Sequence, residues 1–149
     1  MLRELLLAVA IGVSNIAVHA SGGIYLLNKL SAAVPPQHHI SVPRALCALA
    51  QFFLFILTLH VLEAALWAEF YIWKGCFPDR ETAYYFSLMT YTTVGYGDVV
   101  LPRAWRLLGG LEAMTGLLLF GWSTAMLLAL TSRFRQFWDR AEASTRTGQ

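Results

Sequence analysis

The sequence predicts an all-α membrane protein with three transmembrane helices and one shorter helix that re-enters the membrane between the second and third. Apolar residues make up 57% of the 149 residues. The mean hydropathy of +0.54 is higher than expected for a soluble domain of this size. The apolar residues gather into three long runs, and a shorter apolar stretch lies in the polar segment between the last two.

Charge and motifs exclude several classes of function. The formal net charge is only +2, and no basic patch predicts nucleic acid as a partner. Membrane lipid is the expected surrounding. The sequence has no glycine-rich phosphate loop, no metal-ligand motif and no nucleophile beside a base, so we do not expect an enzyme. Cys47 and Cys76 are expected near opposite membrane faces, too far apart for a disulfide.

The first apolar run, residues 5–27, predicts an N-terminal transmembrane helix within residues 1–30. At 1.5 Å per residue it would reach about 34 Å, enough for a hydrocarbon core of about 30 Å. A cleaved signal peptide is the alternative, because Arg3 precedes the run and Val18-His19-Ala20 resembles a cleavage site. Its removal would turn the re-entrant segment toward the cytoplasm, so we expect the helix to be retained.

The next two runs predict the remaining transmembrane helices. A polar linker over residues 31–43 is expected in the cytoplasm, and it is followed by an outer helix over 44–74. The last run predicts an inner helix over 103–134 and a short cytoplasmic tail over 135–149. Arg133, Arg135 and Arg140 suit a cytoplasmic membrane face. Positive charge is nearly balanced between the two faces, so the expected orientation, with the N-terminus outside, rests on the re-entrant segment.

Between these helices, residues 79–91 predict a short helix. Asp79 follows a proline and is the candidate N-cap, with Glu81 in the first turn. A glycine-containing segment, residues 92–98, follows directly. Such a re-entrant loop is tolerated at membrane depth only where protein or an aqueous cavity covers its backbone.

The segment Thr92-Thr93-Val94-Gly95-Tyr96-Gly97-Asp98 resembles the selectivity filter of potassium channels. The resemblance extends over about residues 45–131 and includes both flanking helices. It implies a tetrameric pore built from a pore module over 44–134, with the pore helix at 79–91 and the filter at 92–98. The protein is therefore expected to be a homotetramer that conducts K⁺ passively and has no small-molecule substrate beyond this ion.

The resemblance also implies roles for the filter residues. Backbone carbonyls of Thr93, Val94, Gly95 and Tyr96 are expected to bind K⁺ in place of its water shell, and the Thr93 hydroxyl is expected to complete the innermost site; this is the general mechanism of such filters. Val94 and Tyr96 are expected to pack behind the filter. Gly95 and Gly97 lack a Cβ and so permit the unusual dihedral angles that this backbone requires.

The support of the filter departs from the family pattern. Many relatives carry a pore-helix glutamate that pairs with the aspartate after the filter, but Met89 stands at that position. Tyr85 matches an aromatic position of the family that commonly bonds this aspartate, so the resemblance implies that the Tyr85 hydroxyl supports Asp98. Thr92 and Gly97 complete the filter support.

The inner helix resembles that of the family, with Gly116 at a hinge-like position. Helical periodicity places Leu117, Phe120, Thr124 and Leu128 on one stripe. Such a stripe alone indicates ordinary packing. Next to a filter it indicates a cavity lining, with a hydrophobic gate at Leu128.

Three buried ionisable residues need an explanation, because charges within a membrane are costly. His60 and Glu63 share one face of the outer helix. Counting along the helices places Glu63 and Glu112 at similar depth, so we expect them to meet behind the filter. One interpretation is proton-modulated gating. The favoured interpretation is a structural network of hydrogen bonds between helices.

The leading functional hypothesis is therefore a potassium channel similar to small prokaryotic ones with an extra N-terminal helix, in a bacterial inner membrane. The first run lacks the repeated arginines of a voltage sensor. Two alternatives stay open. One is a poorly selective cation channel, and the other is a non-conducting membrane subunit that regulates another channel or transporter.

Overall fold

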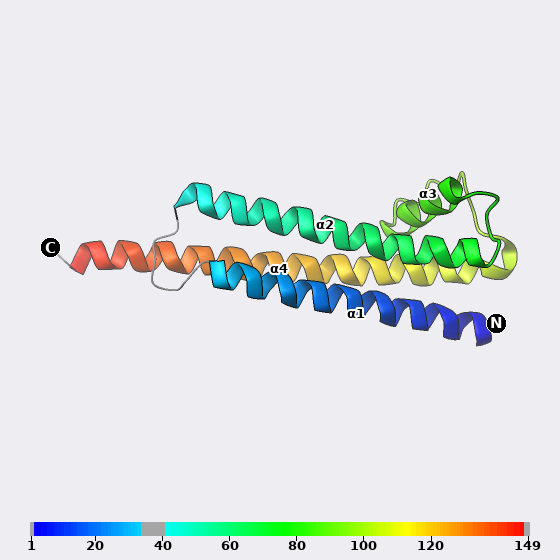
Figure 1. The fold of residues 1–149 in the computed structure, drawn as a ribbon, viewed down its shortest axis with the longest axis horizontal. Coiled ribbons are helices and arrows are strands. Elements are labelled where there is room, and N and C mark those ends of the chain that lie inside the picture. Colours follow the sequence, from blue (N-terminus) through cyan, green and yellow to red (C-terminus); the bar gives the residue numbers. More distant parts are fainter. Residues whose placement is uncertain (1, 34–40, 148–149) are drawn as a thin grey trace.

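Helices make up most of the described part of the chain in this computed structural model, which describes residues 2–33 and 41–147 and contains no strand among them. Residues 74–79 and 92–102 form loops. The elements are α1 (Leu2–Ala33), α2 (Val42–Trp73), α3 (Arg80–Tyr91), the 3-10 turn η1 (Arg103–Trp105) and α4 (Arg106–Thr147). Helices α1, α2 and α4 lie alongside one another (Figure 1). Helix α3 lies beside the end of α2, at the end of the molecule that holds the N-terminus, and the C-terminus lies at the opposite end.

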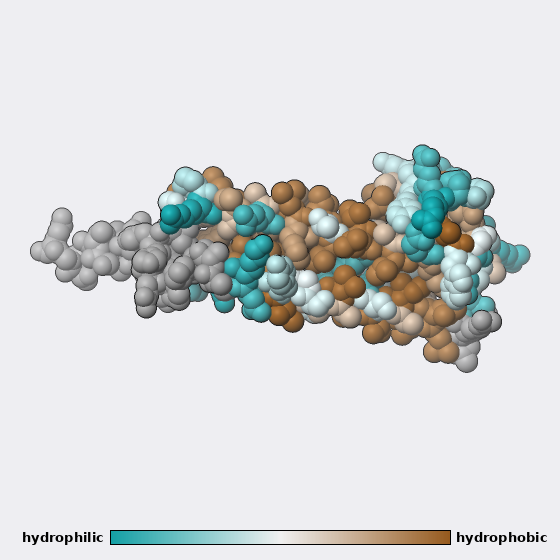
Figure 2. Space-filling view, viewed as in Figure 1, coloured by the Kyte–Doolittle hydropathy of each residue, from teal (hydrophilic) through white to brown (hydrophobic). Residues whose placement is uncertain are grey.

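Three of the described helices are long and apolar enough to cross a membrane, which confirms the three predicted spans. The spans are Glu4–Leu30, Val42–Trp73 and Arg103–Gln136. Their outer faces expose large apolar side chains such as Phe53 and Leu118. Figure 2 shows these apolar residues across the middle of the molecule and polar ones gathered over α3 and its loop. This surface is that of an integral membrane protein.

The start of α3 follows from local chemistry. Asp79 has an extended backbone, and its carboxylate accepts a hydrogen bond of 2.8 Å from the Thr82 backbone N–H, as expected of an N-cap. Glu81 lies in the first turn, where negative charge is favourable. The predicted N-cap is confirmed.

The end of α4 differs from the expected end of the inner helix. The helix continues to Thr147, so most of the segment predicted only as a short tail is helical. Residues 130–147 contain neither glycine nor proline, and nothing in this sequence stops the helix before Gly148. Of the predicted linker, residues 34–40 lie outside the described part.

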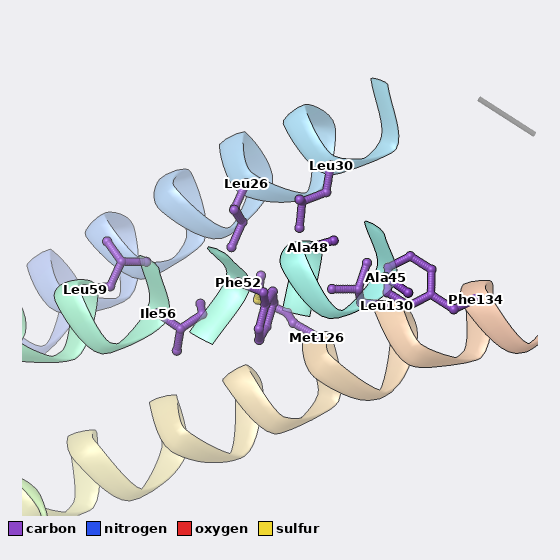
Figure 3. Packing of buried hydrophobic residues seen from close by; sticks show 10 residues of the cluster. All are labelled: Leu26, Leu30, Ala45, Ala48, Phe52, Ile56, Leu59, Met126, Leu130 and Phe134. Carbon is purple, nitrogen blue, oxygen red and sulfur yellow. The ribbon is translucent and has the colours of Figure 1, made fainter. Parts of the chain in front are cut away.

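Apolar packing joins α1, α2 and α4 in the half of the molecule away from α3 (Figure 3). The cluster consists of Leu26, Leu30, Ala45, Ala48, Phe52, Ile56, Leu59, Met126, Leu130 and Phe134. Glycines allow α1 to come close, because a Cβ at Gly22 would lie 2.8 Å from Leu59 and one at Gly23 would lie 2.8 Å from Met126. Such close packing of helices stabilises membrane proteins, since lipid is as apolar as the side chains.

A second cluster holds α3 against the other end of α2 and α4. Its buried members include Trp67 and Tyr71 from α2, Phe86 and Tyr91 from α3, and Leu108 from α4. The aromatic rings pack edge to face, with Tyr71 and Phe86 at a centroid distance of 5.5 Å. This cluster fixes the position of α3 and hence of the loop that follows it.

Candidate functional site

The loop after α3 has an unusual backbone. Its φ angles are positive at every second residue: 62° at Thr93, 49° at Gly95 and 79° at Gly97. Glycine adopts such angles freely, but a β-branched residue such as Thr93 does so at a cost of about 1–3 kcal/mol. Strain of this kind at one residue is typical of a functional segment.

Backbone hydrogen bonds tie the start of this loop to the last turn of α3. Thr93 N–H donates to the Thr90 carbonyl at 2.9 Å, and Gly95 N–H donates to the Met89 carbonyl at 3.0 Å. The Thr92 hydroxyl donates to the Leu88 carbonyl at 2.6 Å. Met89, which lacks the carboxylate of relatives, thus supports the loop through its backbone.

The side chains of the loop have little contact within one chain. Val94 is 49% exposed and Tyr96 is 73% exposed. A Cβ added at Gly95 or Gly97 would meet no atom within 4 Å. The wall expected behind Val94 and Tyr96 is therefore not formed by this chain alone.

Asp98, at the far end of the loop, accepts a hydrogen bond of 2.7 Å from the Tyr85 hydroxyl, which is the contact predicted from the sequence. The bond stabilises the carboxylate, so it lowers the pKa of Asp98 and raises that of Tyr85. Nearby hydrogen bonds join α2 to α3. Glu69 of α2 accepts one from Arg80 at 3.0 Å and one from Tyr84 at 2.7 Å.

Behind the loop lies a buried polar network that takes one or two residues from each helix. Its members are His19 of α1, His60 and Glu63 of α2, Tyr91 of α3 and Ser123 of α4. The two oxygens of Glu63 meet two imidazoles, His19 Nδ1 at 2.9 Å and His60 Nδ1 at 3.1 Å. Tyr91 donates its hydroxyl to the same carboxylate.

Ser123 closes the buried polar network into a ring. Its hydroxyl lies 3.0 Å from His60 Nε2 and 3.2 Å from His19 Nε2. His60 Nδ1 also lies 3.0 Å from the Tyr91 hydroxyl. All five side chains are at most 8% exposed.

The predicted association of the ionisable residues is partly wrong. His60 and Glu63 are hydrogen-bonded to each other, as expected. Glu112 belongs to a separate contact, where its Oε2 accepts a 2.9 Å bond from the Tyr71 hydroxyl and its Oε1 has no partner in the described residues. Ser87 lies beside this carboxyl group without a hydrogen bond of ordinary geometry.

Sequence reasoning missed three members of the network: His19, Tyr91 and Ser123. A signal for His19 was present. Asn15 and His19 lie four residues apart, on one face of an otherwise apolar helix, and polar residues on such a face mark contact with another helix. In the structure Asn15 Nδ2 donates to the Glu63 carbonyl at 3.4 Å.

Residues of the predicted inner-helix stripe differ in their surroundings. Leu117, Thr124 and Leu128 are exposed on α4. Phe120 is half-buried, and its ring stacks on His60 at a centroid distance of 4.1 Å. At Gly116 a Cβ would lie 2.1 Å from the Tyr91 carbonyl oxygen, so α4 touches the end of α3 at this residue.

His19, His60 and Glu63 are also residues whose type and spacing could hold a metal ion, with ligand atoms within 4.8 Å of one another. The carboxylate, however, lies between the rings, and each Nδ1 is hydrogen-bonded to a different oxygen. Metal ligands instead converge on one central point. The arrangement fits hydrogen bonding better than metal coordination.

Comparison with known proteins identifies one matching family. A family model described as "Ion channel" matches residues 48–133, more than half of the chain. The match contains most of α2, all of α3 and its loop, and α4 as far as Arg133, while α1 lies outside it. No curated protein and no solved structure matches.

Proposed function

Because the chain belongs to the ion channel family, we propose that it forms a passive, potassium-selective channel from four identical copies. The family comprises channels and not enzymes. The observation that carries the proposal is the backbone after α3, where every second residue from Thr93 to Gly97 has a positive φ.

This alternation gives a row of oxygens. In an extended strand, successive peptide groups face opposite sides. Reversing the sign of φ at every second residue turns alternate peptide groups over, so neighbouring carbonyl oxygens face the same side. We assign the carbonyls of Thr93, Val94, Gly95 and Tyr96 to ion binding, with the Thr93 hydroxyl at the innermost site, because such oxygens replace the water shell of K⁺.

The number of copies follows from what one chain lacks. A dehydrated ion needs oxygens on all sides, and one chain offers a single row, so cyclic symmetry has to provide the others. The exposed side chains of Val94 and Tyr96 support this proposal. In a tetramer, neighbouring copies would cover them.

The conduction path below the filter is assigned to α4. Leu117, Thr124 and Leu128 are exposed in the single chain, and we assign them to the cavity lining, with dewetting at Leu128 as the gate. Phe120 packs on His60, and we assign it to packing instead. The C-terminal end of α3 carries a partial negative charge that favours a cation in the cavity. The N-terminus and α3 face outside, in a bacterial inner membrane.

Ion flux from purified protein in liposomes tests the proposal. We expect K⁺ flux that barium blocks and that exceeds Na⁺ flux by more than about tenfold, a difference of about 1.4 kcal/mol in free energy. Cross-linking should yield tetramers. K⁺ flux absent from correctly folded protein would contradict the proposal.

Poor selectivity is the second candidate, favoured by a single observation. Among the residues that the structure describes, Asp98 is hydrogen-bonded to one side chain, that of Tyr85, and Met89 offers no carboxylate. Equal K⁺ and Na⁺ flux through the same barium-blocked path would establish this alternative. Absence of any flux from tetrameric protein would favour a non-conducting subunit.

A further inference from the structure

The buried polar network has six close contacts, and each needs a hydrogen between its two atoms. Two of them share His60 Nδ1, so one ring hydrogen can serve both. The other four contacts take one hydrogen each, with the Ser123 hydroxyl donating to one imidazole and accepting from the other, so the network takes five hydrogens. Tyr91 and Ser123 contribute one each, and two neutral imidazoles contribute one each. With Glu63 ionised, only four hydrogens are present, so in one contact two acceptor atoms would face each other with no hydrogen between them.

A fifth hydrogen completes the network. It can lie on either imidazole or on Glu63, and in each case the five side chains together carry no net charge. The members bond to no lysine or arginine in the described residues. Loss of the extra proton would thus leave one unbalanced negative charge at membrane depth, which is costly.

The groups that face the network do not replace this proton. From α1, Asn15 bonds the Glu63 backbone, and from α4 the carboxyl group of Glu112 bonds Tyr71. Phe120 of α4 covers the His60 ring. Apart from the members themselves, Glu112 also acts electrostatically on Tyr91, and any charge on it would be negative.

Tyr91 connects the network to the candidate filter. It is the last residue of α3 and directly precedes Thr92 and Thr93. Its hydroxyl donates a hydrogen bond to Glu63, and its carbonyl oxygen lies in close contact with Gly116. A change in the network therefore acts on the residue from which the filter begins.

We infer that the buried polar network is a binding site for one proton, and that the bound proton joins α1 to the filter through Tyr91. With the proton bound, all contacts are complete and Tyr91 is held. Without it, a contact opens and Tyr91 is released. The effect on conduction rests on the proposed channel function, whereas the proton site does not.

Stability against pH tests the proton site. Above about pH 6.5 an unfolded chain has neutral histidines and an ionised glutamate, so the folded state holds one more proton per chain. Its stability must then fall as the pH rises, with the unfolding constant increasing about tenfold per pH unit. Unfolding of purified protein in detergent, followed by tryptophan fluorescence between about pH 6.5 and about pH 8.5, measures this slope.

Glu63→Gln is the decisive variant, because the amide keeps every contact without a titrating proton. Its N–H can donate to His19 Nδ1, while its oxygen accepts from His60 and Tyr91. We expect a folded variant whose stability lacks the wild-type slope. Because both proteins share all other titrating groups, the difference between them reports on the network. Equal slopes in the two proteins would overturn the proton site.

The variant Tyr91→Phe tests the effect on conduction independently of the proton site. Without the hydroxyl, four contacts and three hydrogens remain, so the extra proton is still required and the stability slope should persist. Where the stability slope flattens at higher pH, the folded protein releases the proton. Over that pH interval wild-type K⁺ flux in liposomes should fall about tenfold, the effect expected when one buried group loses a hydrogen bond. Flux through Tyr91→Phe should not change with pH.

The outcomes separate the two proposals. Wild-type flux that does not fall above the pH at which the stability slope flattens would overturn the link to the filter. A pH response of Tyr91→Phe equal to that of the wild type would overturn it as well. If no flux occurs at any pH, the channel proposal fails, and the unfolding slopes still decide the proton site.

Discussion

The loop after α3 meets the buried polar network at Tyr91, and the two regions differ in how far their side chains are covered within one chain. The network is complete within one chain, with His19 and Glu63 fully buried. The loop leaves Val94 and Tyr96 exposed and strains Thr93. The difference indicates that the network belongs to the folding of the single chain, whereas the loop becomes complete only in an assembly.

The largest expected effect is loss of conduction in Gly97→Ala. Nothing in the chain lies near a Cβ at this residue, so stability should fall only by the cost of a positive φ, about 1–2 kcal/mol. A small change in the row of oxygens should nevertheless abolish K⁺ flux in liposomes. Gly75→Ala is the matched control, because Gly75 has a φ of 65° and equally open space, but lies outside the filter. Equal flux in the two variants would contradict the distinction between the loop, which we assign to conduction, and the network, which belongs to the folding of the single chain.

Gly116→Ala should have the next largest effect, on stability. The new Cβ would lie 2.1 Å from the Tyr91 carbonyl oxygen, which is backbone and cannot turn away. Separation of α4 from α3 should cost about 2 kcal/mol or more, measured by detergent unfolding. At Gly110 of the same helix a Cβ meets nothing within 4 Å, so Gly110→Ala should cost nothing. Similar losses in the two variants would show that α4 does not depend on this contact.

A smaller effect is expected from Tyr85→Phe at the outer end of the loop. Because the Tyr85 bond lowers the pKa of Asp98, its stabilisation is present above the ordinary pKa of about 3.9 and is lost as the pH falls through the lowered value. The variant should lose this acid dependence, and its flux should inactivate faster and select K⁺ less well. Tyr84→Phe is the control, since that hydroxyl bonds Glu69. Unchanged selectivity and inactivation in Tyr85→Phe would remove the proposed support.

The smallest effect is expected from Glu112→Gln. The amide oxygen can still accept from Tyr71, and the amide N–H₂ replaces an oxygen that has no partner. Stability should change by less than about 1 kcal/mol. The dependence of flux on pH should match that of the wild type, because Glu112 is not a member of the network. An altered pH profile would extend the proton site to this residue.

Local spacing accounts for what the sequence predicted well. The three apolar runs and the Asp79 cap depend on nearby residues or on helix length, which periodicity gives directly. The Tyr85–Asp98 bond was predicted from the resemblance to the family. His60 and Glu63 were found together because they lie on one helix face. These features need no knowledge of how helices pack.

The remaining features depend on the rotation of each helix about its axis. Equal depth suggested that Glu63 and Glu112 meet, but depth does not determine which way a side chain points. Glu63 turns toward α1 and Glu112 toward Tyr71. Contact of His19 with Glu63 joins residues 44 apart in the sequence. Exposure of the loop also cannot be read from one chain's sequence.

Gly116 divides α4 into two arms of unequal length. Because Gly116 contacts the Tyr91 carbonyl, α4 can pivot at this residue. At 1.5 Å per residue, about 15 Å of helix lies on its N-terminal side and about 46 Å on its C-terminal side. A rigid tilt about this point would move the C-terminal end about three times as far as the end beside the filter. A modest force at the end of the longer, C-terminal arm would accordingly act with a larger force on the shorter arm.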